Sequence, residues 1–338
     1  MSPNLSKTSQ NSNIEENSSP FSWKRAWMAT PGPYTFREYS YLFLKGICMG
    51  TADIIPGVSG GTIAFITGIY YELISAISSI NCKLIVHALR FNFKKALSEF
   101  HLRFLFTLFL GIAIAVVSTA NLMHFLLGKF PIHIWAIFFG LISASILVVG
   151  NSIKNRLSSF PPLILGTLMA YTITGLIPLN TPDDSWFVFL CGIIAICAMI
   201  LPGLSGAFIL LILGKYSFIT MALKNPFLVE NLQIILIFCL GCLIGIILFS
   251  KLLRYSLSRW HDYTLGILTG IMIGSMRKVW PWKITLESQI IRGKEYVIRE
   301  ENVLPLFNYE LFLVILLMCF GFAVVLILEK ISKLDSKN

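Results

Sequence analysis

The sequence predicts an all-α polytopic membrane protein with an inverted structural repeat, in which each half contains one re-entrant helical hairpin and three transmembrane helices. Of the 338 residues, 56% are hydrophobic and 13% are charged, about half the charged fraction of a soluble protein. Apolar runs long enough to cross a bilayer recur along the chain. The segment IIPGVSGGT (Ile54–Thr62) interrupts one run and returns as ILPGLSGAF (Ile200–Phe208) in another.

The N-terminal residues 1–37 form a polar tail whose Ser- and Asn-rich start is expected to be disordered. The tail lacks the apolar core of a cleavable signal peptide, so the first membrane segment is expected to act as the insertion signal. A shorter polar tail at 331–338 follows the last predicted span.

The first repeat is predicted over residues 38–178. A hairpin at about 41–77 is broken at Pro56-Gly57, and spans follow at about 103–127, 132–150 and 161–178. The arm before the break would reach only about 22 Å as a helix, less than the bilayer core of about 30 Å. This short reach favours a segment that turns back inside the membrane.

The second repeat is predicted over residues 179–330, with the same order of elements. Its hairpin at about 186–222 is broken at Pro202-Gly203, and spans follow at about 231–252, 262–279 and 309–329. The polar residues 280–308 lie between the last two spans and are expected outside the membrane, where a small hairpin is one possible form.

An internal duplication explains why the two halves match. When Gly46–Tyr70 is aligned with Gly192–Tyr216, about half of the positions are identical, including a shared PGxSG. Phe138–Ser145 also matches Leu268–Ser275. Chance similarity between apolar helices does not account for a shared PGxSG.

Basic residues orient the two halves. Placing the basic loops inside satisfies the positive-inside rule if each broken segment returns to the side that it entered from. Three spans then separate the repeats, so the halves must be inverted and both termini cytoplasmic. The residues placed inside are Lys83, Arg90, Lys94, Lys95, Arg103, Lys154, Arg156, Lys251, Arg254, Arg259, Lys330, Lys333 and Lys337.

Composition and spacing also exclude several classes of function. The net charge of +10 comes mainly from loops between apolar runs, which indicates topology and headgroup contact and no nucleic-acid partner. The seven cysteines and five histidines show no spacing typical of a metal site, so no metal or other cofactor is expected. Neither GxxxxGK[ST] nor a strand-linked GxGxxG is present to bind a nucleotide.

Each broken segment is interpreted as two half-helices that meet near the middle of the membrane. One half-helix is expected to end near Ile55, and Ser59 is expected to cap the next, which leaves backbone N–H groups at Gly60, Gly61 and Thr62. Ser205, Gly206 and Ala207 repeat the pattern. A helix N-terminus at this depth can receive an anion, as in transporters with broken helices. A glycine-rich packing contact is the alternative.

Four charged residues in or beside apolar segments add to this hypothesis. Lys45 and Asp53 are spaced so that they share one helix face; Lys45 either snorkels to headgroups or lines a headgroup route, and Asp53 either titrates or caps N–H groups. Arg277 and Lys278 either anchor the helix end at the interface or capture a phosphate.

These segments resemble the bacterial PopT family of polyprenyl-phosphate transporters. The resemblance covers about residues 38–330 and rests on LKGICMGTADIIPGVSGGTIAFITGIYYELI, PGLSGAFILLILGKY and LTGIMIGSMRKVWPWK. It implies that undecaprenyl phosphate is recycled from the outer to the cytoplasmic leaflet of the bacterial inner membrane for envelope polymers. In the second copy, Met199 and Ala207 replace the acidic residue and the second glycine.

The candidate site combines the motif residues with the basic pair. As substrate-binding residues we predict Gly57, Ser59, Gly60, Gly61, Thr62, Gly203, Ser205, Gly206, Arg277 and Lys278, with Pro56 in the same motif and Lys45 and Asp53 in coupling or support. Protons are the candidate coupling partner. A transporter of a small anion or other solute is the alternative, since an inverted repeat permits it equally. A lipid-phosphate phosphatase is disfavoured, because no histidine lies near PGxSG.

Overall fold

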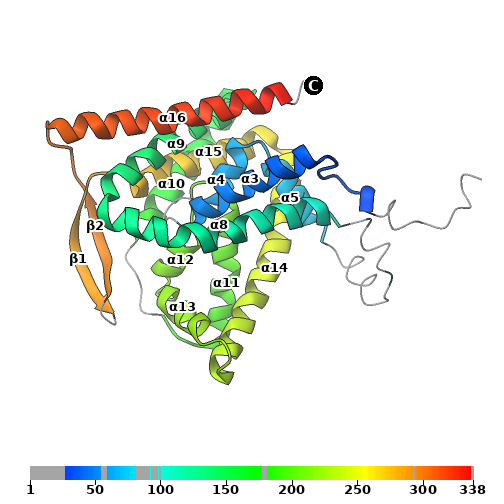
Figure 1. The fold of residues 1–338 in the computed structure, drawn as a ribbon, viewed down its shortest axis with the longest axis horizontal. Helices are drawn as coiled ribbons and strands as arrows, with labels where there is room; N and C mark the ends of the chain where they lie inside the picture. The colour runs from blue at the N-terminus through cyan, green and yellow to red at the C-terminus, as the bar shows by residue number, and fades with distance from the viewer. Residues whose placement is uncertain are drawn as a thin grey trace, which may run out of the picture.

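A computed structural model of the chain describes residues 27–54, 59–80, 92, 98, 100–176, 181–291 and 294–335 and is mostly helical (Figure 1). The start of the polar tail and the Pro56-Gly57 break lie outside these residues. In chain order the elements are α3 (Phe36–Asp53), α4 (Gly60–Ile66), α5 (Tyr70–Ser78), α8 (Leu102–Lys129), α9 (Pro131–Asn151), α10 (Arg156–Thr174), α11 (Ser185–Ile200), α12 (Gly206–Ile212), α13 (Tyr216–Lys224), α14 (Val229–Arg259), α15 (His261–Val279), β1 (Lys283–Ile291), β2 (Lys294–Asn302) and α16 (Tyr309–Asp335).

Membrane-spanning helices are identified by length and apolar composition. Among the described residues, five helices are long and apolar enough to cross a bilayer, namely α8, α9, α10, α14 and α16. Helix α15 has 19 residues but does not reach this apolar composition, because its ends carry His261 and Asp262 in the first turn and Arg277 and Lys278 in the last. The chain is therefore a mostly helical, multi-pass membrane protein.

Each half contains a pair of short helices with a sharp bend. The axes of α4 and α5 differ by 119°, and those of α12 and α13 by 114°, which raises the span candidates to seven if each bent pair is one span. Gly68 and Gly214 lie at the bends with φ of 74° and 66°, a conformation that favours glycine. Each pair is either a broken span or a re-entrant loop, so the re-entrant form stays a prediction.

Helix pairs recur at matching positions in the two halves. Helix α3 packs on α8 and α11 packs on α14, while α9 packs on α16 and α10 packs on α15. A β-carbon at Gly46 would overlap the carbonyl oxygen of Leu108, and one at Gly192 would overlap that of Phe238. The same close backbone approach at aligned glycines supports an internal duplication.

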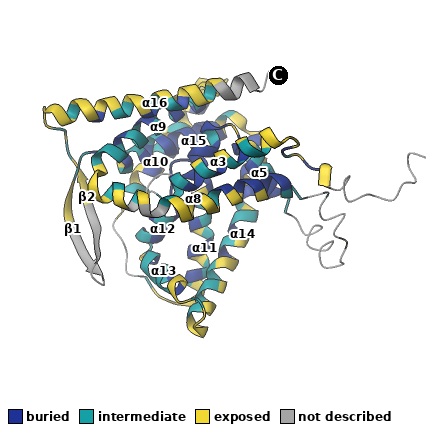
Figure 2. Ribbon diagram, in the orientation of Figure 1, coloured by how far each residue is buried: buried dark blue, intermediate teal, exposed yellow. Residues whose placement is uncertain are grey.

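Helix α15 lies at the centre of the molecule, and α14 and α16 lie at its surface (Figure 2). Leu265, Leu268 and Met272 of α15 are almost fully buried, whereas Leu236 of α14 and Leu316 of α16 are more than half exposed. Exposed apolar side chains along long helices are what a lipid-facing surface requires. The core of the bundle thus surrounds the helix that ends at Arg277 and Lys278.

The one sheet that the described residues form is the antiparallel pair β1 and β2, which connects α15 to α16. Indole Nε1 of Trp280 donates to the carbonyl of Val303 at 2.9 Å, and Nδ2 of Asn302 donates to the carbonyl of Arg277 at 2.8 Å. These bonds hold the base of the hairpin against the end of α15. The base of this hairpin therefore lies beside the basic pair.

Candidate functional site

The first PGxSG motif begins α4, and Ser59 caps it. The hydroxyl of Ser59 accepts the N–H of Gly61 at 3.1 Å, and the backbone carbonyl of Ser59 accepts the N–H of Thr62 at 2.9 Å. Oδ1 of Asp53 accepts the N–H of Gly60 at 2.7 Å. The backbone donors that the sequence offered for an anion are thus already paired within the protein. Gly57 lies outside the described residues.

The two motifs contact each other directly. Ser59 donates from its hydroxyl to the carbonyl of Leu201 at 3.1 Å, and the N–H of Gly203 donates to Oγ1 of Thr62 at 2.9 Å. The buried hydroxyl of Tyr70 donates to the carbonyl of Ile200 at 3.3 Å. These bonds connect segments about 140 residues apart and bring the halves together at the two breaks.

The second motif lacks the carboxylate of the first. Met199 stands at the position that matches Asp53, and Ser205 at the start of α12 makes no side-chain cap. Gly203 has a φ of 89°, and a β-carbon on it would lie 2.7 Å from Oγ of Ser275 and 3.0 Å from Cα of Met272. The second break therefore packs on α15, one turn before the basic pair.

A cavity of about 690 Å³ adjoins this second motif, a volume typical of ligand sites. Its cationic side chains are Arg277 and Lys278 of α15 and Lys283 of β1, and Glu300, Glu301 and Asn302 of β2 also line it. The apolar part of the lining includes Phe139 of α9, Phe208, Leu211 and Ile212 of α12, and Ile273 and Met276 of α15. One cavity thus joins positive charge to an apolar wall.

Aromatic rings and a glycine position the two cations of α15. The guanidinium of Arg277 lies 4.6 Å from the ring centre of Tyr171, and a β-carbon at Gly175 would overlap that guanidinium. Nζ of Lys278 lies 5.0 Å from the ring centre of Phe208 in α12. Such contacts favour a cation over the ring face; they attach Arg277 to α10 and Lys278 to the second broken segment.

Lys283 is the third cation and the most deeply placed. Its side chain is only 9% exposed, and Nζ lies 4.4 Å from the ring centre of Trp135 and donates to the carbonyl of Lys278 at 2.6 Å. Burial lowers the pKa of Lys283 to about 8, although the carboxylate of Glu300 opposes this effect. Lys283 therefore carries a proton at neutral pH and loses it in mildly alkaline solution.

Glu300 provides the negative charge in contact with the lysines. Its Oε2 lies 3.1 Å from Nζ of Lys278 and 3.4 Å from Nζ of Lys283, so one oxygen bridges both cations. Burial alone would raise the pKa of Glu300, but Lys283 and Lys278 hold it below its ordinary value. The carboxylate is therefore ionised at neutral pH.

Lys45 lies in a different cavity, of about 700 Å³, beside the start of α3. Arg37, Glu38 and Glu72 line the same cavity, so its two cations face two carboxylates. The structure does not place Lys45 with Arg277 and Lys278. A charge-balanced lining makes this cavity a weaker anion site than the one at the end of α15.

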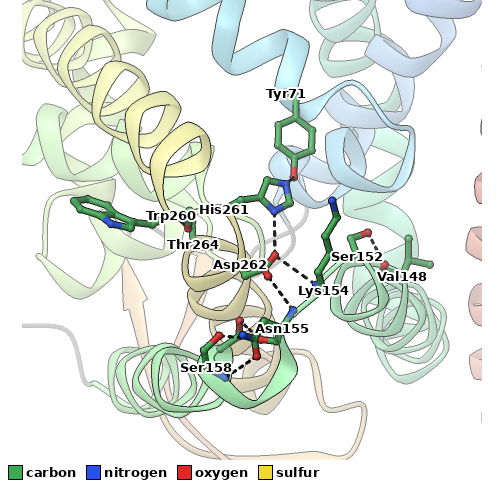
Figure 3. Close-up of polar contacts among 11 residues, drawn as sticks. Tyr71, Val148, Ser152, Lys154, Asn155, Ser158, Trp260, His261, Asp262 and Thr264 are labelled. Carbon is green, nitrogen blue, oxygen red and sulfur yellow. Dashed lines mark hydrogen bonds and ion pairs between the residues drawn. The ribbon is translucent and has the colours of Figure 1, made fainter.

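A separate polar cluster ties together the other end of α15 (Figure 3). Tyr71 of α5 and Nε2 of His261 lie 3.2 Å apart, and Asp262 accepts the N–H of Asn155 at 2.9 Å and that of Lys154 at 3.4 Å. The cluster joins α5 to the beginnings of α10 and α15. It holds helices in place and lies at the end of α15 away from the basic cavity.

The structure thus assembles most of the predicted residues into two adjoining groups. The described motif residues meet at the two breaks, and Arg277 and Lys278 line the cavity beside the second break. The sequence did not single out Lys283, Glu300 or Phe208. Their signal is weak, because two of them belong to a polar connecting segment and the third looks like any apolar residue of a membrane helix.

Comparison with known proteins gives the family. Over 306 residues the chain is 42% identical to a polyprenyl-phosphate transporter of Vibrio cholerae serotype O1, covering 88% of this chain and 98% of the relative. It is 32% identical over 257 residues to a polyprenyl-phosphate transporter of Staphylococcus aureus, covering 70% and 85%. No solved structure matches the chain. Both names describe transport and not an enzymatic reaction. Residues 49–296 match the VCA0040-like family, described as undecaprenyl phosphate translocase-like, and the chain belongs to this family.

Proposed function

We propose that this protein transports a polyprenyl phosphate across the bacterial cytoplasmic membrane, from the outer to the cytoplasmic leaflet, so that the lipid carrier is reused in envelope polymer synthesis. The names of the relatives supply the class of substrate. The observation that carries the proposal is the cavity at the end of α15, which places three cations beside an apolar wall. A lipid phosphate has the same two parts, an anionic head and an apolar chain.

In this proposal the phosphate enters the cavity and contacts Arg277, Lys278 and Lys283. Hydrogen bonds between phosphate oxygens and charged donors are stronger than neutral ones, and Arg277 can present two donors at once. The first isoprene units lie against Phe208 and the neighbouring side chains of α12. Contact with α12 gives the bound lipid a way to move the second broken segment.

The two PGxSG motifs then form the region through which the halves move. Their mutual hydrogen bonds hold the breaks together in the conformation described above. To bind phosphate directly, the N–H groups of Gly60 and Gly61 would first have to break their hydrogen bonds to Asp53 and Ser59. Direct phosphate binding by Gly206 at the uncapped start of α12 requires no such exchange.

The inverted orientation of the two halves is part of the same proposal. Its supports are the aligned PGxSG motifs, the matching helix pairs and the distribution of basic loops. With both termini cytoplasmic, the cavity at the end of α15 opens toward the outer leaflet. Labelling of cysteines introduced at Asp183 and Glu301 should show both positions outside, and inside labelling of either one would overturn this topology.

Transport itself is tested in liposomes that contain the purified protein and a fluorescent NBD-labelled polyprenyl phosphate. Dithionite added outside quenches only the outer leaflet, so a transporter should raise the quenched fraction above that in protein-free liposomes. Arg277→Gln combined with Lys278→Gln should abolish this gain, and Lys251→Gln in α14 is the matched control. Uptake of inorganic phosphate without lipid movement would instead favour a small-anion transporter.

The direction of transport needs intact cells. Outer-leaflet undecaprenyl phosphate should accumulate when the protein is removed and should return to its normal level when the wild-type protein is restored. The double variant should not restore it at equal abundance. An unchanged outer-leaflet pool after removal would contradict the proposed direction.

A further inference from the structure

We propose that Glu300 is an exchangeable counter-ion of the basic cavity, whose carboxylate occupies the place of the lipid phosphate and is displaced by it. The inference rests on the proposed function, because it assumes that a phosphate binds at Arg277, Lys278 and Lys283. It adds a role for the hairpin between α15 and α16, for which the sequence predicts only a position outside the membrane.

The geometry of Glu300 is that of a bound anion. A single oxygen, Oε2, lies within 3.4 Å of both lysine Nζ atoms, as a phosphate oxygen would. The carboxylate side chain is 28% exposed, so it can leave the lysines without opening the core of the protein. Its neighbour Asn302 is bonded to α15 at the base of the hairpin, which keeps Glu300 close to the cavity.

The charge balance of the cavity explains why such a carboxylate is useful. Lys283 is nearly buried and Lys278 is 22% exposed, so two close cations would repel each other without an anion. The single negative charge of Glu300 offsets one of these two positive charges while the cavity holds no substrate and reduces the repulsion between the lysines. When the phosphate leaves, the carboxylate returns to the lysines and again provides their negative partner. Release of the lipid therefore does not leave the two cations without an anion.

Exchange makes a quantitative prediction about affinity. The cost of removing Glu300 from the lysines is the same for every ligand that displaces it. Glu300→Gln should therefore tighten binding of farnesyl phosphate and of its monoanionic methyl ester by the same factor, about three- to tenfold for a partly exposed pair of contacts. If Glu300 instead stayed in the cavity and repelled the ligand, Glu300→Gln would increase the affinity for dianionic farnesyl phosphate more than the affinity for its monoanionic methyl ester.

Exchange also predicts an effect on turnover. Because Glu300 helps the phosphate to leave, Glu300→Gln should lower KM for NBD-labelled polyprenyl phosphate and lower kcat as well. A purely structural role would reduce both affinity and rate, or neither. Glu310→Gln in α16 removes a carboxylate that does not line the cavity, so this variant should behave nearly as wild type.

Cross-linking tests displacement in the wild-type protein, without any substitution. A carbodiimide activates a carboxyl group, which the amine of a contacting lysine then attacks, forming an amide and releasing the urea by-product. Mass spectrometry should find Glu300 joined to Lys278 or Lys283 in the free protein, with a severalfold lower yield at saturating farnesyl phosphate. Because no residue is altered, this measurement holds even if Glu300→Gln folds poorly.

The outcomes separate this inference from the proposed function. If farnesyl phosphate does not bind the wild-type protein, or binds equally after Arg277→Gln and Lys278→Gln, the proposed site is wrong. If binding depends on those cations but Glu300→Gln leaves affinity and turnover unchanged, only the exchange role is overturned. A cross-link yield that ligand does not reduce would likewise overturn exchange and leave the site in place.

Discussion

The two broken segments share a motif but differ in what occupies it. In the first, Asp53 and Ser59 pair with the N–H groups at the start of α4. In the second, Met199 replaces the aspartate and the Ser205 side chain makes no cap, so the start of α12 has no side-chain cap. Helix α12 also borders the basic cavity. The comparison indicates that one copy holds the halves together, whereas the other lies beside the proposed substrate.

A duplicated motif can thus keep its backbone geometry while its side chains specialise. Thr62 and Phe208 occupy the same position in the two copies. Thr62 accepts a hydrogen bond from the other motif, whereas Phe208 contacts Lys278 and lines the cavity. One position therefore serves the joint between the halves in the first copy and the ligand site in the second.

The largest effect is expected at the second break, from Gly203→Ala. The new β-carbon would lie 3.0 Å from Cα of Met272 in α15, and alanine is strained at a φ of 89°. We expect a loss of about 2–4 kcal/mol, which strain and overpacking together produce. Thermal unfolding in detergent would measure it. Gly128→Ala in α8, where no atom lies within 4 Å, should not lower the melting temperature, because alanine favours a helix more than glycine does. Equal losses in both variants would contradict tight packing at the break.

A pair of substitutions at one aligned position separates the roles of the two copies. Thr62→Val leaves the N–H of Gly203 without its acceptor, which should cost about 1–3 kcal/mol of stability and leave ligand affinity unchanged. Phe208→Leu keeps an apolar side chain but removes the ring beside Lys278, so affinity for farnesyl phosphate should fall about threefold with little loss of stability. The reverse pattern would show that the specialisation has been assigned to the wrong copies.

Asp53 has two proposed roles that substitution can distinguish. Asp53→Ala removes the acceptor of the Gly60 N–H and should destabilise the protein by about 1 kcal/mol, as loss of a helix cap does. Asp53→Asn keeps an acceptor but cannot titrate, so it should retain the stability and lose the pH dependence of transport if Asp53 couples protons. A wild-type pH profile in Asp53→Asn would leave Asp53 as a cap alone.

The breaks and the basic pair each have a local signal in the sequence. Ser59 was expected to cap the half-helix that follows the break, and it does so in the structure. The bonds of Ser59 to Leu201 and of Thr62 to Gly203 could not be predicted residue by residue, since they depend on how the two halves pack. The packing of Gly206 also depends on the folded structure: a β-carbon there would lie 2.7 Å from the carbonyl oxygen of Ala195. A larger residue at this position would therefore disturb helix packing as well as any bound ligand.

The smallest expected effect is a pH dependence that belongs to the second copy and its cavity. Because burial lowers the pKa of Lys283 to about 8, the cavity should lose one of its three cations as the pH rises through that value. The charged groups that face Lys283 are Lys278 of α15 and Glu300 of β2, and Trp135 of α9 faces it without charge. A phosphomonoester has a second pKa near 6, so the ligand keeps nearly constant charge between pH 7 and about 9.5.

Affinity for farnesyl phosphate should therefore fall about threefold between pH 7 and about 9.5, the loss expected for one partly exposed charge contact. Lys283→Arg stays charged throughout this range and should abolish the dependence, whereas Lys283→Gln should bind at the weaker level at both pH values. Because Glu300 raises the pKa of Lys283, Glu300→Gln should move the midpoint below that of the wild type. A pH profile that is the same in wild type and Lys283→Arg would show that the titrating group is not Lys283, and it would remove the third cation from the proposed contacts of the phosphate.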